Sequence, residues 1–300
     1  MVPTASRGRV TQDGAPALSW PSCIFCATHD PKPFLQPGGI AIVTCRQCGH
    51  CYSTFPREEA YAQYFGEKIH SADYAAHQAF WADAHRRVHR RVLAQMGSSG
   101  LRILDVGCGL GYFVKEAMLS GADAHGCEIS KSAVHYAREV LGLSTILPGR
   151  VEELPYQPNS FDLITLWDVV EHLTNPLPML TAVHRLMSPG GTLFIQTPNV
   201  RFHKISALLK HRLGNSDPSL MEPCDHMNNF SRTSLSRLLS LAGYSRVRFA
   251  VLPAVESLGL NQSPMLVAMK RSYVLMSQGV FFLTWGRVVV SNTLHAFASK

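Results

Sequence analysis

Apolar and polar positions between residues 99 and 271 follow two alternating patterns. Short apolar segments at 101–106, 122–128, 144–147, 160–167 and 192–196 predict strands. The stretches between and after them repeat apolar residues at helical spacing, which predicts helices at 112–119, 131–140, 178–187, 201–212 and 232–242. This alternation is typical of an α/β domain built on a mainly parallel sheet.

The pattern changes at both ends of this domain. Residues 1–17 are rich in Pro, Gly, Ser and Ala and predict a disordered lead-in. Residues 56–98 predict a helical lid or linker, with helices at 57–65 and 72–96. We expect the domain to close with a hairpin whose strands are 246–252 and 264–269.

The last segment, 272–300, is apolar and predicts a tail helix. Its apolar stretches are interrupted by polar residues, so a membrane-spanning helix is the weakest interpretation. Packing on the domain or on a partner chain is the leading interpretation, and peripheral contact with a membrane is the second.

The strand 101–106 breaks at once into three glycines, Gly107, Gly109 and Gly111, which precede the helix 112–119. Glycines allow a tight turn and let a nucleotide-bearing ligand lie against main-chain amides at the helix N-terminus. Glu128 ends the second strand, where a carboxylate can accept hydrogen bonds from both ribose hydroxyls. The two features together predict a nucleotide-type site.

The segment Leu104-Asp-Val-Gly-Cys-Gly-Leu-Gly111 resembles the first motif of class I S-adenosylmethionine-dependent methyltransferases. Dinucleotide dehydrogenases space these glycines differently, as G-x-G-x-x-G. The resemblance implies an α/β, Rossmann-like, seven-stranded domain with S-adenosylmethionine as cofactor. It implies cofactor contacts from Asp105, Gly107, Gly109, Gly111, Tyr112, Glu128, Ile129, Val151, Glu152 and Trp167.

One position departs from the family pattern. Enzymes of this type often place an acid after the glycine at position 149, to meet the adenine amino group, and here that residue is Arg150. The backbone near Val151 and the side chain of Glu152 are the expected substitutes.

The chemistry candidates follow the fourth strand. Asp168, Glu171 and His172 have the spacing of one helical face, which permits a metal site or an acid/base pair. The segment resembles the E-x-x-E-H of quinone O-methyltransferases, where it is associated with a divalent metal. A metal role, a direct substrate or base role, and a structural role all remain open.

A second base candidate is His226. The segment from Asp225 to Ser231 resembles the one that these methyltransferases place over the active site. The expected catalytic residues are therefore His172, His226 and Glu171.

Two cysteine pairs, Cys23-x-x-Cys26 and Cys45-x-x-Cys48, are separated by eighteen residues. This spacing predicts a tetrahedral zinc site in a small zinc ribbon over 18–55. Cys51 lies off the spacing and is expected to be a bystander. The ribbon and the helical segment after it resemble those of bacterial methyltransferases that carry an N-terminal zinc ribbon.

Lys and Arg outnumber Asp and Glu by 28 to 21, and the net charge of +7 suits nucleic acid, nucleotide sugars or a phospholipid surface. The leading hypothesis is O-methylation of a small molecule: a saccharide, a quinone-like lipid or a secondary metabolite. An RNA methyltransferase that binds through the ribbon is the first alternative, and a non-catalytic interaction protein is the second.

The ribbon lacks a basic strand interleaved with aromatics, so nucleic acid is not the expected partner. The intact glycine turn and Glu128 argue against a non-catalytic protein. No secretory signal is recognised, which predicts a cytoplasmic protein, in contact with the inner face of the membrane if the tail binds lipid. The oligomeric state is left open.

Overall fold

The computed structural model describes residues 21–35, 40–55, 85–212, 221, 223–252 and 264–300. The predicted lead-in, the helix 57–65 and the first part of the helix 72–96 lie outside these ranges. The second part of that helix is confirmed, because residues 85–96 are helical.

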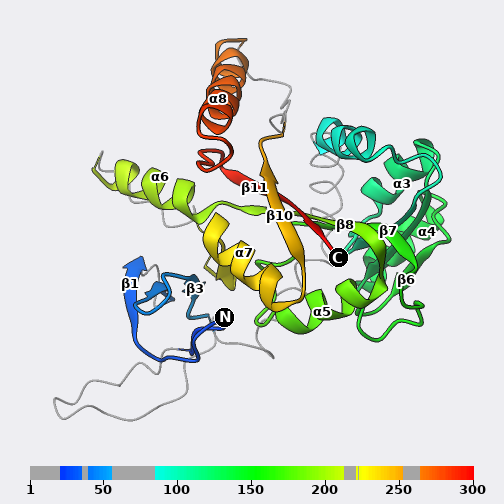
Figure 1. Ribbon diagram of the computed structural model, residues 1–300, viewed down its shortest axis with the longest axis horizontal. Helices are drawn as coiled ribbons and strands as arrows, with labels where there is room; N and C mark the ends of the chain where they lie inside the picture. The colour runs from blue at the N-terminus through cyan, green and yellow to red at the C-terminus, as the bar shows by residue number, and fades with distance from the viewer. Residues whose placement is uncertain (1–20, 36–39, 56–84, 213–220, 222, 253–263) are drawn as a thin grey trace.

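The predicted seven-stranded sheet is present, in the order β10-β11-β8-β7-β4-β5-β6 (Figure 1). Its strands are β4 (Arg102–Val106), β5 (Asp123–Glu128), β6 (Ile146–Pro148), β7 (Phe161–Trp167), β8 (Met187–Pro198), β10 (Ser245–Ala250) and β11 (Thr293–Ser299). The five strands from β4 to β8 pair in parallel, while β11 is antiparallel to both of its neighbours. The sheet is thus parallel with an antiparallel edge, as in Rossmann-like folds.

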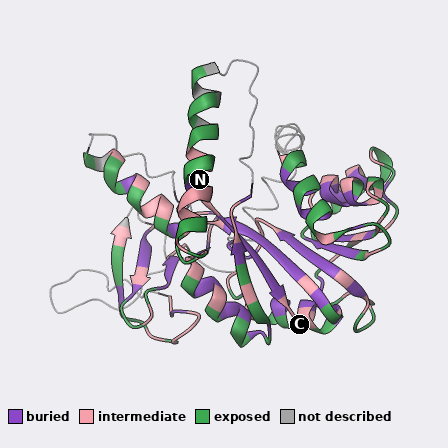
Figure 2. Ribbon diagram, turned by 45° about the horizontal axis from the view of Figure 1, so that its top comes forward, coloured by how far each residue is buried: buried purple, intermediate pink, exposed green. Residues whose placement is uncertain are grey.

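Alternate residues of each strand point to opposite faces of this sheet, so both faces carry apolar side chains, and helices cover both. Ile103 packs in a core with the helix 85–96, α3 (Tyr112–Leu119) and α4 (Lys131–Glu139). Its neighbour Leu104 packs on the other side with α5 (Leu177–Leu186) and α7 (Arg232–Leu241). Figure 2 shows most of the central strands buried between these layers, whereas the edge strand β10 is largely exposed.

The prediction of a strand at 264–269 is wrong, because α8 (Pro264–Leu283) begins there. A short apolar run is compatible with either structure, and here it continues at helical spacing. The tail helix predicted over 272–300 is correct as far as Leu283 but wrong at its end. Residues 293–299 form β11, which supplies the strand that we expected at 264–269. None of the helices in the described ranges has the length and apolar character needed to cross a membrane.

A second sheet joins the cysteine segment to the large domain. It has the order β1 (Pro31–Leu35), β2 (Ile42–Cys45), β3 (Cys51–Ser53) and β9 (Asn228–Asn229). The strand β9 comes from the connection between α6 (Val200–Arg212) and α7, and it pairs with β3 through Tyr52 and Asn228. The cysteine segment is therefore built onto the loop that carries His226.

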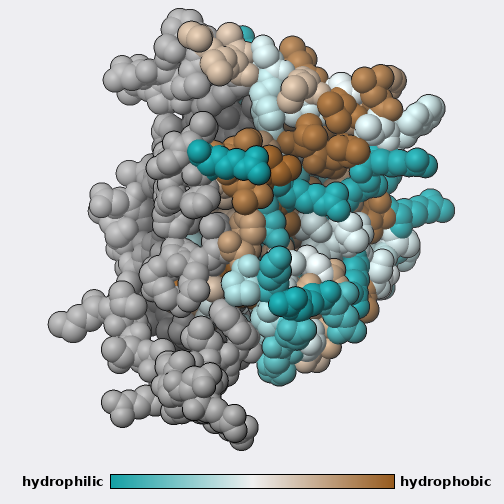
Figure 3. Space-filling model, turned by 90° about the vertical axis from the view of Figure 1, so that its left-hand side faces the viewer, coloured by the Kyte–Doolittle hydropathy of each residue, from teal (hydrophilic) through white to brown (hydrophobic). Residues whose placement is uncertain are grey.

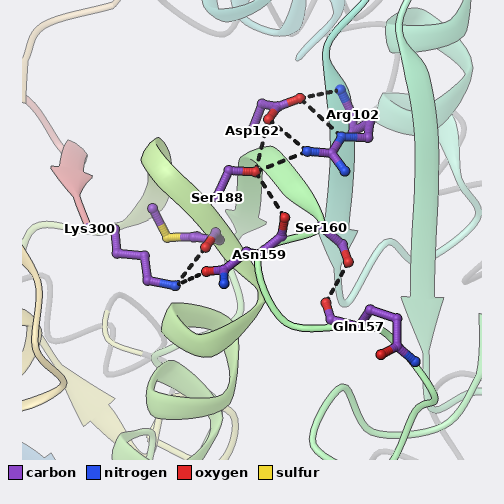
Figure 4. A network of polar contacts seen from close by, with 8 residues as sticks. Arg102, Gln157, Asn159, Ser160, Asp162, Ser188 and Lys300 are labelled. Carbon is purple, nitrogen blue, oxygen red and sulfur yellow. Dashed lines mark hydrogen bonds and ion pairs between the residues drawn. The ribbon is translucent and has the colours of Figure 1, made fainter.

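Polar contacts tie the amino ends of the strands together (Figure 4). The backbone N–H of Arg102 donates to Asp162 Oδ2 at 3.0 Å, and Ser188 Oγ donates to Asp162 Oδ1 at 2.9 Å. Lys300 Nζ donates to Asn159 Oδ1 at 2.6 Å and to the carbonyl of Met187 at 2.7 Å. The amino ends of the strands are thus held together by polar contacts, whereas the predicted site residues lie at the opposite, carboxyl ends.

Candidate active site

The glycine turn after β4 has the conformation that its sequence predicts. Gly107, Gly109 and Gly111 all have positive φ, at 71°, 53° and 85°. A Cβ on Gly111 would lie 2.7 Å from the Cδ1 atoms of both Leu143 and Ile146, so any other residue at this position would force these buried side chains to move. The turn is fixed by sterics as well as by backbone conformation.

Glu128 holds this turn in place. Its Oε2 accepts a hydrogen bond from the backbone N–H of Gly109 at 2.9 Å, and its Oε1 accepts one from Ser130 at 2.9 Å. The residue is only 8% exposed. A carboxylate has about four acceptor positions, so two remain for ligand hydroxyls. Glu128 can therefore shape the turn and contact a ribose at the same time.

Asp105, near the end of β4, is hydrogen-bonded to the neighbouring strand β7. It is buried and accepts a hydrogen bond from Thr165 Oγ1 at 2.7 Å. Burial raises the pKa of Asp105 to about 8, and the nearby Glu128 carboxylate contributes to this rise. The hydrogen bond of Asp105 thus links β4 to β7 just before the glycine turn.

The other predicted cofactor residues surround the turn at different depths. Tyr112 is half-buried, with its hydroxyl 3.1 Å from the hydroxyl of Tyr136, and Ile129 is 63% exposed. Val151 is buried in the core and Glu152 is exposed. Trp167, at the end of β7, packs edge-on against His89 and lies against Phe113. The predicted cofactor residues thus include aromatic side chains, an exposed apolar side chain at Ile129 and the Glu128 carboxylate.

The expected helical face at 168–172 is not present. Residues 170–172 form a turn, and Asp168 has a left-handed backbone with φ 53°. Its carboxylate Oδ2 accepts a hydrogen bond from Gln196 Nε2 at 2.8 Å. Strained backbone of this kind costs on the order of 1–3 kcal/mol and persists where surrounding contacts impose it. Asp168 is therefore directed toward β8, away from Glu171 and His172.

Sequence reasoning missed the residues that hold Asp168. Gln196 is buried at the carboxyl end of β8, and its Oε1 lies 3.2 Å from His295 Nε2 on β11. Burial lowers the pKa of His295 to about 3, so the imidazole is neutral and donates to the amide oxygen. The signal in the sequence was a lone polar residue in the apolar strand Leu193-Phe-Ile-Gln196.

The three predicted catalytic residues converge. One ligand atom from each of Glu171, His172 and His226 lies within 4.8 Å of the others, although His226 is far away in the sequence. The imidazole rings of His172 and His226 are 5.0 Å apart. Glu171 is buried, and its Oε2 accepts a hydrogen bond from Thr197 Oγ1 at 2.9 Å.

The tautomer of His172 follows from its partner. His172 Nδ1 lies 2.9 Å from the carbonyl oxygen of Asp225, and a carbonyl only accepts. Nδ1 therefore carries the proton, and in the neutral ring Nε2 keeps a lone pair. Such an imidazole can accept a proton or bind a metal through Nε2.

A second cluster consists of Cys23, Cys26, Cys45 and Cys48, whose sulfur atoms all lie within 4.8 Å of one another. Cys51 is not among them and contacts Thr44 Oγ1 instead, at 3.4 Å. Four thiolates around zinc at about 2.3 Å lie roughly 3.8 Å apart, so the arrangement is compatible with a zinc site.

Comparison with known proteins agrees with this geometry. A family model described as a methyltransferase domain matches residues 75–248. The ubiquinone biosynthesis O-methyltransferase of Xanthomonas campestris pv. campestris (strain B100) is 35% identical over 113 residues, which are 36% of this chain and 47% of that relative. The protein of the same name from Dechloromonas aromatica is 37% identical over 106 residues, or 34% and 46% of the two chains. This chain thus aligns with about half the length of the curated relatives it matches.

A solved structure shows the same fold. It comes from the Haloferax volcanii complex between the Trm112 methyltransferase activator and a methyltransferase, with a TM-score of 0.51 and 16% identity over 81% of this chain and 98% of that one. At this identity the likeness concerns the fold alone. The family match covers more than half of the 300 residues, and the chain belongs to the methyltransferase domain family, whose methyl donor is S-adenosylmethionine.

Proposed function

We propose that this chain transfers a methyl group from S-adenosylmethionine to a hydroxyl of a small, quinone-like aromatic molecule. The names of the relatives, which are ubiquinone biosynthesis O-methyltransferases, support an aromatic hydroxyl as the acceptor. The family match and the ordered glycine turn beside Glu128 support the donor. A saccharide or another secondary metabolite is the alternative acceptor.

The observation that carries this proposal is the convergence of Glu171, His172 and His226 at the carboxyl edge of the sheet. In an in-line displacement the acceptor oxygen bonds to the methyl carbon, and the sulfur leaves with the electrons of the broken S–C bond. The hydroxyl proton must go to a base, because a neutral hydroxyl is a poor nucleophile. His172 Nε2 is the proposed acceptor of this proton, and His226 is the second candidate.

The same three side chains also fit a divalent cation. One carboxylate and two imidazoles, with ligand atoms within 4.8 Å of one another, form a common donor set for transition metals. A cation held by these residues would lower the pKa of a bound hydroxyl. Asp168 is not among these converging residues, and its carboxylate accepts a hydrogen bond from Gln196 instead.

The four-cysteine cluster is proposed to hold zinc in a structural role. A site closed by four thiolates leaves no coordination position for a substrate. We expect the purified protein to contain one zinc per chain, and Cys45→Ser to lose it. A zinc content near zero in the folded wild type would remove this part of the proposal.

The proposed function is tested with methyl-labelled S-adenosylmethionine, a soluble catechol as acceptor, and RNA in a parallel reaction. We expect label in the catechol, and His172→Ala to lower kcat by about 10²–10⁴-fold. His135→Ala, an exposed histidine on α4, is the matched control and should change nothing. Label in RNA instead would make this an RNA methyltransferase. Absence of both binding and transfer would indicate a non-catalytic protein.

The variant Glu171→Gln distinguishes a mechanism in which His172 acts as a simple base from one that needs a bound cation. Glutamine still accepts the hydrogen bond of Thr197 but is a poor cation ligand. If His172 acts as a simple base, this variant keeps most of its activity, and a chelator has no effect. If a cation is needed, activity is lost in both cases and added Mg²⁺ or Mn²⁺ restores the chelated wild type.

A further inference from the structure

The helix α8 presents an apolar stripe on its exposed side. Its exposed large side chains are spaced by four residues, from 265 to 269, and by seven, from 269 to 276 and 283 and from 275 to 282, which places them along one side of the helix. Phe282 is 82% exposed, and Trp285, just after the helix, is 92% exposed. The exposed apolar residues of this segment are Met265, Met269, Leu275, Met276, Phe282, Leu283 and Trp285.

The opposite side of α8 is fixed to the protein. The hydroxyl of Tyr273 donates to the carbonyl of Val290 at 2.7 Å, and its ring lies 5.9 Å from that of Phe202 on α6. Ser277, one turn further along, is buried. These contacts set the rotation of α8 about its axis, so the stripe is held facing outward.

The neighbouring helix α6 also exposes apolar side chains. It exposes Ile205, Leu208 and Leu209, although the helix is basic in sequence. Figure 1 shows both helices projecting from the body of the domain, and Figure 3 shows hydrophobic atoms gathered in the upper half of one face with hydrophilic side chains beside them. We call the exposed sides of α6 and α8, together with Trp285, the projecting surface.

The charge of the projecting surface has one sign. The sequences of α6 and α8 contain six Lys or Arg residues and no Asp or Glu. Arg271 and Arg287 are exposed beside the apolar residues. Two copies of this chain joined through α8 would bring positive charges together, whereas a bilayer that contains anionic lipids offers apolar depth and negative headgroups at once.

We propose that the projecting surface docks on an anionic lipid bilayer, with the side chains of the stripe and Trp285 inserted at the interface and the basic residues against lipid phosphates. Aromatic and aliphatic side chains on one side of a helix, with basic residues beside them, are the features of helices that lie in a membrane interface. This inference is independent of the methyl acceptor.

The test is sedimentation of the purified full chain with vesicles. Phosphatidylcholine mixed with phosphatidylglycerol should bind the protein, phosphatidylcholine alone should bind it weakly, and added salt should release it. The double variant Phe282→Ser/Trp285→Ser should bind roughly a hundredfold more weakly, since each lost insertion weakens binding by about tenfold. Arg271→Glu/Arg287→Glu should lose the preference for phosphatidylglycerol.

The matched control is Leu119→Ser/Leu241→Ser, which removes two exposed leucines on α3 and α7, outside the projecting surface, and should not change binding. Trp285 fluorescence adds a direct signal, because its emission should shift to shorter wavelength on vesicles and the shift should be absent in Trp285→Phe. Equal binding to both vesicle types, no binding, or a soluble dimer that Phe282→Ser dissociates would each overturn the proposal.

Discussion

His50 Nε2 lies 3.0 Å from Asn228 Oδ1, and this contact joins the cysteine segment to the loop that carries His226. His50 follows Cys48 by two residues, and Asn228 follows His226 by two. Asn228 also contacts the turn at 171–173. Its side-chain amide donates to the carbonyl of Leu173, and its backbone N–H donates to the carbonyl of Glu171. The conformation of the turn at 171–173 is therefore linked to the fold of the cysteine segment through one asparagine.

We expect Asn228→Ala to lower kcat by about 10- to 100-fold while the KM for S-adenosylmethionine stays unchanged. The reason is that Asn228 positions Glu171 and the loop of His226 but lies away from the glycine turn. Steady-state kinetics with each substrate varied in turn measure the two constants. Asn292→Ala, an exposed asparagine, is the control. An unchanged kcat in Asn228→Ala would show that the link has no catalytic consequence.

Glu128→Ala should weaken S-adenosylhomocysteine binding by about 10- to 100-fold, since hydrogen bonds to a charged group are worth about 1.5–3 kcal/mol. The variant loses acceptors for the ligand and also for the backbone N–H groups of Gly109 and Ser130. Isothermal titration calorimetry measures the affinity. Glu153→Ala, an exposed acid nearby, should bind as the wild type does. Equal affinities in the two variants would exclude Glu128 from the cofactor site.

Gly111→Ala and Gly142→Ala separate backbone strain from steric overlap. Both glycines have positive φ, at 85° and 72°, but a Cβ meets Leu143 and Ile146 only at Gly111. We expect Gly142→Ala to lower the free energy of unfolding by roughly 1 kcal/mol and Gly111→Ala to lower it by about 1–3 kcal/mol more. Urea denaturation measures both. Equal losses would mean that the turn can move away from the added methyl group.

The buried carboxyl of Asp105 should make stability fall as pH rises. Its pKa in the folded protein, about 8, lies above its usual value of 3.8. Between these values the unfolded chain releases a proton that the folded protein keeps, so the free energy of unfolding decreases by up to about 1.4 kcal/mol per pH unit. Asp105→Asn removes this dependence, and its stability relative to the wild type should increase from about pH 5 to about pH 8.

Asp162→Asn should change the pH dependence of stability in the opposite direction. Burial would raise the pKa of Asp162, but the hydrogen bonds from Arg102 and Ser188 and the charge of Arg102 hold it below its usual value. Its stabilising effect is present above the usual pKa and is lost as pH falls through the lowered one. The variant should therefore be less stable than the wild type at neutral pH, with the difference shrinking in acid. The same trend in both variants would contradict the burial argument for Asp105.

Local patterns were sufficient to predict most of the large domain. The strands from β4 to β8 and the helices between them follow from apolar periodicity, and the glycine turn follows from residues adjacent in the sequence. The resemblance to known motifs was sufficient to select His172 and His226, which the structure brings together.

Contacts between distant segments could not be predicted in the same way. The strand β9 has two residues, too few for a periodic signal, and its pairing with β3 joins Cys51 to Asn229 and Tyr52 to Asn228, far apart in the sequence. The strand at 264–269 was predicted from apolar content that α8 shares. Asp168 was assigned to the face of Glu171 because the left-handed backbone that turns it toward Gln196 leaves no trace in residue spacing.

The position of β11 between β8 and β10 has a consequence for the order of folding. The chain is synthesised from β4 toward β11, yet β10 joins the sheet only through β11. Until residues 293–299 have been synthesised, β8 has an open edge of unpaired backbone groups and β10 has no partner in the sheet of the described residues. Such edges are prone to pair with other chains, so the nascent protein is most exposed to aggregation while the α8 segment is still being translated.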